Sequence, residues 1–242
     1  MEKKKPFSEE VKTKCLLWSD RHCGVCGKSC GLDIEVHHID PKEDNIQDNA
    51  IPVCYNCHAK LGRYIDSQPR GTKYKIQEIK KSRDQIYERY TSHLVPGLLP
   101  TIYPTSTEPS TYYLPQIGFA IAPVGQFIPV KATIVVKTFL GGKDLGKIGS
   151  KIPYYDGGII WHLNPGLRFR GNFTIPKVCA ESKEALQLEL NITIIDPYER
   201  EHKLLPVCFT YVRKAEPNDG YWFLEPTSFA QLEQYVKKSN TD

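Results

Sequence analysis

The sequence contains no long hydrophobic run. No stretch approaches the roughly 18 apolar residues of a membrane-spanning helix, and the mean hydropathy is −0.42. The basic start, Met1 to Lys5, is not followed by an apolar segment, so we expect no secretory signal, a cytoplasmic location and no membrane partner. No internal repeat is evident, and the 11% aromatic content excludes low-complexity disorder. A net charge of +4 permits a nucleic-acid partner without requiring one.

The cysteines are unevenly distributed, because six of the eight lie before residue 58. A reducing cytosol disfavours disulfides, so their spacing is more informative than their number. Two CxxC pairs, Cys23/Cys26 and Cys54/Cys57, are separated by 27 residues. Each pair forms a tight knuckle that directs two thiolates at one ion, and two knuckles complete a tetrahedral Zn²⁺ site. Cys30 is close enough to replace one of these ligands, and that alternative stays open.

Proline content rises near residue 95. Five prolines fall between residues 96 and 115, among many Ser and Thr, which excludes a helix or a central strand there. We expect a first domain over residues 1–95, a second over 117–242, and an extended linker over 96–116. An ordered loop packed on one domain is the alternative for the middle segment.

The two halves differ in their predicted elements. Before the linker, apolar periodicity and a Ser8 cap predict helices over residues 7–20 and 73–94. After it, strict alternation over 186–194 predicts a half-buried strand. Short strands with turns between them favour an antiparallel β-sandwich, so the fold class is α+β. The remaining predicted elements are strands over 130–140, 168–175, 204–212 and 221–224, and a last helix over 228–238.

The segment between the two CxxC pairs carries the chemistry. Apolar and polar residues alternate over 32–36, which predicts a strand that delivers His37 and His38 to its end. A polar loop then returns the chain to Cys54, and a helix begins at the Cys57–His58 step. The predicted unit is therefore strand, strand, helix.

This pattern resembles the HNH endonuclease family, with its ββα-metal fold, over about residues 20–65. The resemblance rests on paired histidines before Ile39, on Asn49 five residues before the third zinc-frame cysteine, and on CxxC followed by His. It implies a structural Zn²⁺ beside a separate nuclease centre. It assigns the general base to His38 and makes His58 and Asn49 the last His and the central Asn of the motif. His37 falls where many family members carry a metal ligand.

The chemistry of the side chains fits these roles. A neutral imidazole is a suitable base near pH 7 because its ordinary pKa is about 6.5. We expect His38 to take a proton from water, and His37 and His58 to hold one divalent ion, Mg²⁺ or another. Adjacent strand residues point to opposite faces, so the paired histidines should differ in role. Asn49 is expected to orient a loop or histidine. Taken singly, each of these histidines and Asn49 has a simpler structural explanation. Taken together with the two CxxC pairs, they favour a nuclease.

A basic segment follows the motif. Residues 60–89 carry nine Lys or Arg against four Asp or Glu. These bases either contact phosphates, with Lys60 and Arg63 as first candidates, or form the solvated face of a helix. DNA is the expected partner, with RNA left open. The alternative function is a non-catalytic zinc module that binds nucleic acid or protein. A homo-oligomer through the 73–94 helix is a further alternative.

The second half of the sequence shows no metal cluster, phosphate loop or nucleophile signature, and its charges are nearly balanced. A small nuclease joined to an accessory domain fits restriction or anti-phage defence by analogy. We therefore expect the second domain to act as a sensor, targeting or assembly module.

Overall fold

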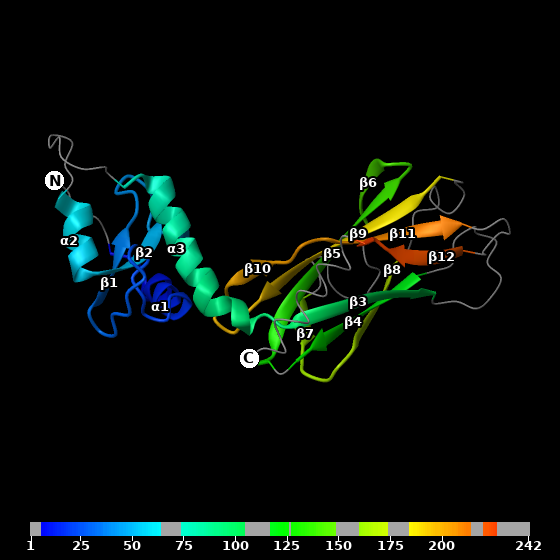
Figure 1. The fold of residues 1–242 in the computed structure, drawn as a ribbon, viewed down its shortest axis with the longest axis horizontal. Helices are drawn as coiled ribbons and strands as arrows, with labels where there is room; N and C mark the ends of the chain where they lie inside the picture. Colours follow the sequence, from blue (N-terminus) through cyan, green and yellow to red (C-terminus); the bar gives the residue numbers. More distant parts are fainter. Residues whose placement is uncertain are drawn as a thin grey trace. The chain divides into compact units, whose positions relative to one another are not determined.

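The computed structural model describes residues 6–63, 74–104, 117–125, 127–148, 160–173, 184–213 and 220–226 (Figure 1). The chain has an α+β fold and divides into two compact units. Unit 1 comprises Met1–His93 with Tyr198–Arg200, and unit 2 comprises Leu94–Pro197 with Glu201–Asp242. None of the described helices is long and apolar enough to cross a membrane.

Unit 1 contains the predicted strand–strand–helix order. Strand β1 (Ile34–His38) pairs antiparallel with β2 (Ala50–Cys54), with Ile34 opposite Cys54 and His38 opposite Ala50. The short 3₁₀ helix η1 (Gln47–Asn49) precedes β2, and α2 (Tyr55–Arg63) follows it directly. Unit 1 also contains the helices α1 (Glu9–Trp18) and α3 (Ile76–Thr91). The short 3₁₀ helix η2 (Ser92–Leu94) follows α3 at the boundary with unit 2.

Local sequence explains where the first helix begins. The Ser8 hydroxyl accepts a hydrogen bond from the Val11 N–H, and two glutamates occupy the first turn of α1. The α1 side of the β1–β2 hairpin is covered by a small core of Phe7, Cys15 and Ala50, with Val36 packed against it. The other side packs in a separate core, in which Cys23 and Cys57 are buried with Ile51, Val53 and Ile79.

Helix α3 uses its apolar face inside unit 1. Ile79 and Ile86 are buried, and between them lies Arg83, only 4% exposed. Its guanidinium donates to the carbonyl oxygens of Asp48 (2.5 Å) and Ala50 (3.3 Å) and pairs with the Asp48 carboxylate (3.2 Å). The arginine that interrupts the apolar spacing of this helix therefore ties α3 to η1 and β2.

We predict that Arg83→Met lowers the free energy of unfolding of unit 1 by about 2 kcal/mol, because two backbone carbonyls lose their buried donor. Arg89→Met, on an exposed position of the same helix, is the matched control and should be nearly neutral. Chemical denaturation followed by circular dichroism measures both variants. Equal stability of the two would contradict the assigned role of Arg83.

The described residues of unit 2 form two antiparallel sheets (Figure 1). The main hydrophobic core of the unit contains residues of both sheets. The larger sheet has the order β12-β11-β9-β5-β6, with β10 on β9 and β7 on β5; the smaller has the order β3-β4-β8. Leu98, Phe119 and Ile121 of the smaller sheet pack with Leu188 and Leu190 of the larger one. The strands are β3 (Gly97–Pro104), β4 (Ile117–Val124), β5 (Val130–Leu140), β6 (Lys143–Ile148), β7 (Ile160–Leu163), β8 (Phe169–Phe173), β9 (Leu186–Ile195), β10 (Glu201–Lys203), β11 (Val207–Arg213) and β12 (Gly220–Leu224).

The linker predicted over residues 96–116 is wrong for its first half. Residues Gly97–Pro104 form β3, which pairs with β4 along its whole length. Pro100 and Pro104 are tolerated because β3 lies at the end of its sheet, where one side of the strand needs no donors. The rest of the predicted linker, 105–116, and the predicted helix over 228–238 lie outside the described residues.

Candidate functional site

Four thiols meet at one point of unit 1. The Sγ atoms of Cys23, Cys26, Cys54 and Cys57 all lie within 4.8 Å of one another, and those of Cys26 and Cys54 are 4.0 Å apart. A tetrahedral zinc ion with Zn–S bonds of about 2.3 Å places its sulfurs roughly 3.8 Å apart. The cluster therefore has the donor type, number and size of a Cys₄ zinc site.

The first knuckle is held against strand β2. The Gly24 N–H donates to the Pro52 carbonyl oxygen at 2.7 Å, and the Ser82 hydroxyl of α3 donates to the Gly24 carbonyl oxygen at 2.8 Å. A Cβ atom at position 24 would lie 2.7 Å from Cγ1 of Ile51, so only glycine permits this approach. This contact brings the first pair of thiols to the second.

In the second knuckle, the surroundings lower the pKa of one of the two cysteines. Burial opposes ionisation of Cys54, yet hydrogen bonds from the Cys57 N–H and the neighbouring thiols lower the pKa of Cys54 to about 7. Burial raises the pKa of Cys57 and of Cys26. Cys30 does not belong to the group of four, and its thiol donates to the Lys28 carbonyl oxygen at 3.1 Å.

A second cluster lies where β1 faces α2. The imidazole rings of His37 and His58 are edge to face, with centroids 4.6 Å apart. Glu35, two residues before His37 and on the same face of β1, places a carboxylate oxygen 3.0 Å from Nδ1 of His58. Glu35 is not among the site residues predicted from the sequence, although its i, i+2 spacing from His37 places both side chains on one face of the strand.

The local environment keeps His37 neutral. Burial, together with the charges of His58 and His38, lowers the pKa of His37 to about 4. A neutral imidazole offers the lone pair that a metal ion requires. Two imidazoles with an adjacent carboxylate are a donor set that fits a divalent transition ion.

His38 lies on the opposite face of the strand from His37, as the alternation requires. Its ring stacks on buried Phe7 with centroids 4.0 Å apart and an interplanar angle of 22°. Its Nε2 atom lies 2.7 Å from the side-chain oxygen of Asn45. Neither contact has a signal in the sequence, because residues 7 and 45 reach the strand only through tertiary structure.

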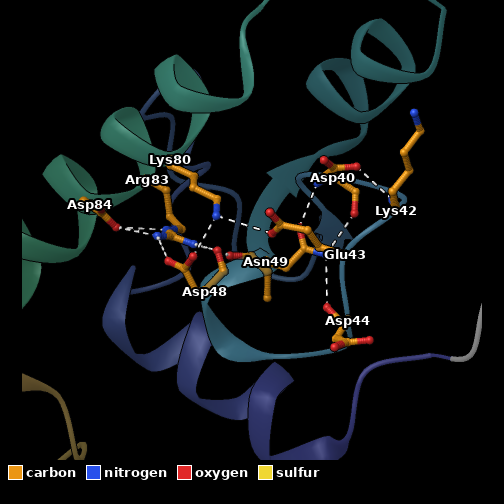
Figure 2. A network of polar contacts seen from close by, with 10 residues as sticks. Asp40, Lys42, Glu43, Asp44, Asp48, Asn49, Lys80, Arg83 and Asp84 are labelled. Atoms are coloured by element: carbon orange, nitrogen blue, oxygen red, sulfur yellow. Dashed lines mark hydrogen bonds and ion pairs between the residues drawn. The ribbon is translucent and has the colours of Figure 1, made fainter.

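Asn49 is fully buried, and among the described residues its side chain hydrogen-bonds to backbone groups of the loop before it (Figure 2). Its side-chain oxygen accepts from the Asp40 N–H at 2.7 Å. Its amide group donates to the carbonyl oxygens of Asp40 at 2.9 Å and Asp44 at 3.1 Å. Because one side chain bridges both ends of the 40–44 segment, Asn49 sets the shape of the loop that leads to Asn45.

Lys60 is exposed on α2, while the side chain of Arg63, at the end of that helix, lies outside the described residues. The structure thus brings the rings of His37 and His58 into contact. In chain order, His38 precedes and Asn49 follows the loop that contains Asn45. It brings the four cysteines into a separate cluster.

Comparison with known families fits this geometry. Residues 23–63 match a family model described as HNH endonuclease. This segment is an HNH domain. The HNH domain contains both knuckles, the β1–β2 hairpin and α2, so it spans the thiol cluster and all three histidines. No curated protein matches the chain.

Proposed function

We propose that the protein is a metal-dependent HNH endonuclease that hydrolyses phosphodiester bonds in DNA. Members of the HNH family are nucleases, and the match covers the segment that carries the histidines. The observation that best supports catalysis is the separation of two histidine environments on one strand. His37 meets His58 on one face, and His38 is fixed by Phe7 and Asn45 on the other. A zinc scaffold alone does not require this arrangement.

In this proposal His38 acts as the general base. It takes a proton from water as the water oxygen bonds to phosphorus. The bond from phosphorus to the leaving oxygen then breaks, and that oxygen takes up a proton from solvent. His37 and His58 would hold a divalent ion, whose charge stabilises the phosphate and the leaving oxygen when it is bound. Asn49 keeps the 40–44 segment in shape, and Lys60 and Arg63 are the proposed contacts to phosphates.

Glu35 has a positioning role in the same proposal. Its carboxylate oxygen lies 3.0 Å from Nδ1 of His58. In the proposal a hydrogen on Nδ1 is held toward this carboxylate, which leaves Nε2 as the nitrogen that can bind the ion. Imidazole donors suit ions such as Ni²⁺ better than Mg²⁺, so we expect activity with Ni²⁺ or Mn²⁺ to exceed that with Mg²⁺.

We predict that Glu35→Gln weakens binding of the catalytic ion by about 10–100-fold, because the amide is a weaker acceptor for His58. Calorimetric titration of the zinc-loaded protein with Mn²⁺ measures the affinity. Glu78→Gln, at an exposed position on α3, is the control. An unchanged affinity in Glu35→Gln would remove Glu35 from the site.

The substrate is tested with labelled duplex DNA, single-stranded DNA and RNA of one sequence, each with Mg²⁺, Mn²⁺ and Ni²⁺. The proposal predicts cleavage of DNA that requires a divalent ion. Binding without cleavage under every condition would instead favour a non-catalytic zinc module.

We further propose that unit 2 senses, targets or assembles the nuclease, as in restriction or anti-phage defence. This last step rests on analogy with nucleases that carry accessory domains.

A further inference from the structure

A side chain that the HNH motif does not include touches the proposed base. The side-chain oxygen of Asn45 lies 2.7 Å from Nε2 of His38, and among the described residues it is the one hydrogen-bond partner of that ring. We propose that Asn45 is a positioning residue that fixes His38 in the Nε2–H tautomer. Nδ1 is then the nitrogen that takes the proton from water. This inference rests on the proposed function for its catalytic meaning, but its structural content can be tested alone.

The direction of the hydrogen bond follows from the chemistry of the acceptor. An amide oxygen only accepts, so the contact requires a hydrogen on Nε2 of His38. A neutral imidazole carries one hydrogen, and its other ring nitrogen then holds a lone pair. Asn45 thus selects both the tautomer and the edge of the ring that acts as the base.

Two further contacts hold the ring in place. Phe7, only 4% exposed, stacks on the His38 ring and restricts rotation out of its plane. Asn45 bonds to one edge of the ring and restricts rotation within the plane. A base must be held close to the productive geometry before it can act efficiently, and these contacts do so at the end of β1.

The loop that carries Asn45 is held by a hydrogen bond before this residue and by ion pairs after it (Figure 2). Immediately before it, the Asp44 carbonyl oxygen accepts from the Asn49 amide at 3.1 Å. After it, Asp48 pairs with Lys80 at 2.7 Å and with Arg83 at 3.2 Å, both from α3. The same cations hold the pKa of the Asp48 carboxyl below its ordinary value, Lys80 contributing most. The position of Asn45 is therefore set by the fold of unit 1.

The experiment compares Asn45→Leu, which removes the acceptor at nearly constant size, with Asn45→Asp, which keeps an oxygen acceptor. Nitrogen NMR of the ¹⁵N-histidine-labelled full chain, at a pH well above the ordinary pKa of about 6.5, reports which ring nitrogen carries the hydrogen. We expect an exchange-protected Nε2–H signal for His38 in the wild type and in Asn45→Asp. We expect Asn45→Leu to lose this protection.

Kinetics on a DNA substrate supply the second measurement. Loss of the positioning contact should lower kcat by about tenfold in Asn45→Leu and leave KM unchanged, and Asn45→Asp should recover most of the rate. A wild-type His38 with its hydrogen on Nδ1 would overturn the inference. So would an Asn45→Leu variant with the wild-type signal and the wild-type kcat. If the wild type cleaves no nucleic acid, the proposed function fails, while the NMR result still decides the tautomer.

Discussion

Replacing His38 with alanine is expected to slow phosphodiester cleavage by about 10²–10⁴-fold, the usual contribution of a positioned general base. The imidazole is the group proposed to take the proton from water, and no other described side chain occupies its place between Phe7 and Asn45. The substitution removes one stacking contact and one hydrogen bond, so unit 1 should lose only about 1–2 kcal/mol of stability. Single-turnover cleavage of a DNA substrate measures the effect.

His93→Ala is the matched control, because His93 is exposed on η2 and outside the HNH domain. It should cleave at the wild-type rate. Added imidazole should restore part of the rate to His38→Ala, since a free base can enter the space that the side chain leaves. Cleavage by His38→Ala at the wild-type rate, with zinc still bound, would exclude His38 as the base.

Replacing Cys54 with serine is expected to remove the zinc ion and unfold unit 1. Structural zinc contributes about 10–16 kcal/mol of apparent binding free energy in small zinc domains, which is comparable to the whole stability of a domain. In this chain the cluster is also part of a core, because Cys23 and Cys57 are buried with Ile51 and Val53. Loss of one ligand therefore disrupts both the metal site and the packing around the β1–β2 hairpin.

Cys30→Ser provides the comparison, because Cys30 lies beside the cluster but is not one of its four members. Native mass spectrometry should find one zinc per chain in the wild type and in Cys30→Ser, and none in Cys54→Ser. Circular dichroism should show loss of helix in Cys54→Ser alone. Loss of zinc from Cys30→Ser, with retention in Cys54→Ser, would reassign the ligand set.

Features with local sequence signals could be predicted. The spacing of two CxxC pairs predicts the thiol cluster, and the alternation before His37 predicts β1. The predicted strand over 130–140 coincides with β5, because the segment is rich in β-branched residues and two glycines follow it. In these places local pattern and tertiary packing agree, so the pattern is sufficient.

Features that depend on tertiary neighbours could not be predicted. The prolines favour a linker where the structure has β3, because the sequence does not show that this segment lies at the edge of a sheet, where proline is tolerated. Strands β4, β6, β7 and β10 were not predicted, since Gly118 and Pro123 interrupt β4, Gly146 interrupts β6, and β7 and β10 have only four and three residues.

The same limit applies to the candidate site. Arg83 reads as an interruption of the apolar face of α3, yet it is buried because backbone carbonyls of residues 48 and 50 face it. The contact of Asn45 with His38 likewise needs the folded loop.

The measurement that tests the central claim most directly is cleavage of supercoiled plasmid by the zinc-loaded full chain, with His38→Ala beside it. Each protein is incubated with Mg²⁺, Mn²⁺, Ni²⁺ or a brief excess of EDTA. The account predicts nicked or linear plasmid with the wild type and a divalent ion, none in EDTA, and almost none with His38→Ala. Intact plasmid with every ion, from a folded wild-type protein that holds its zinc, would contradict it.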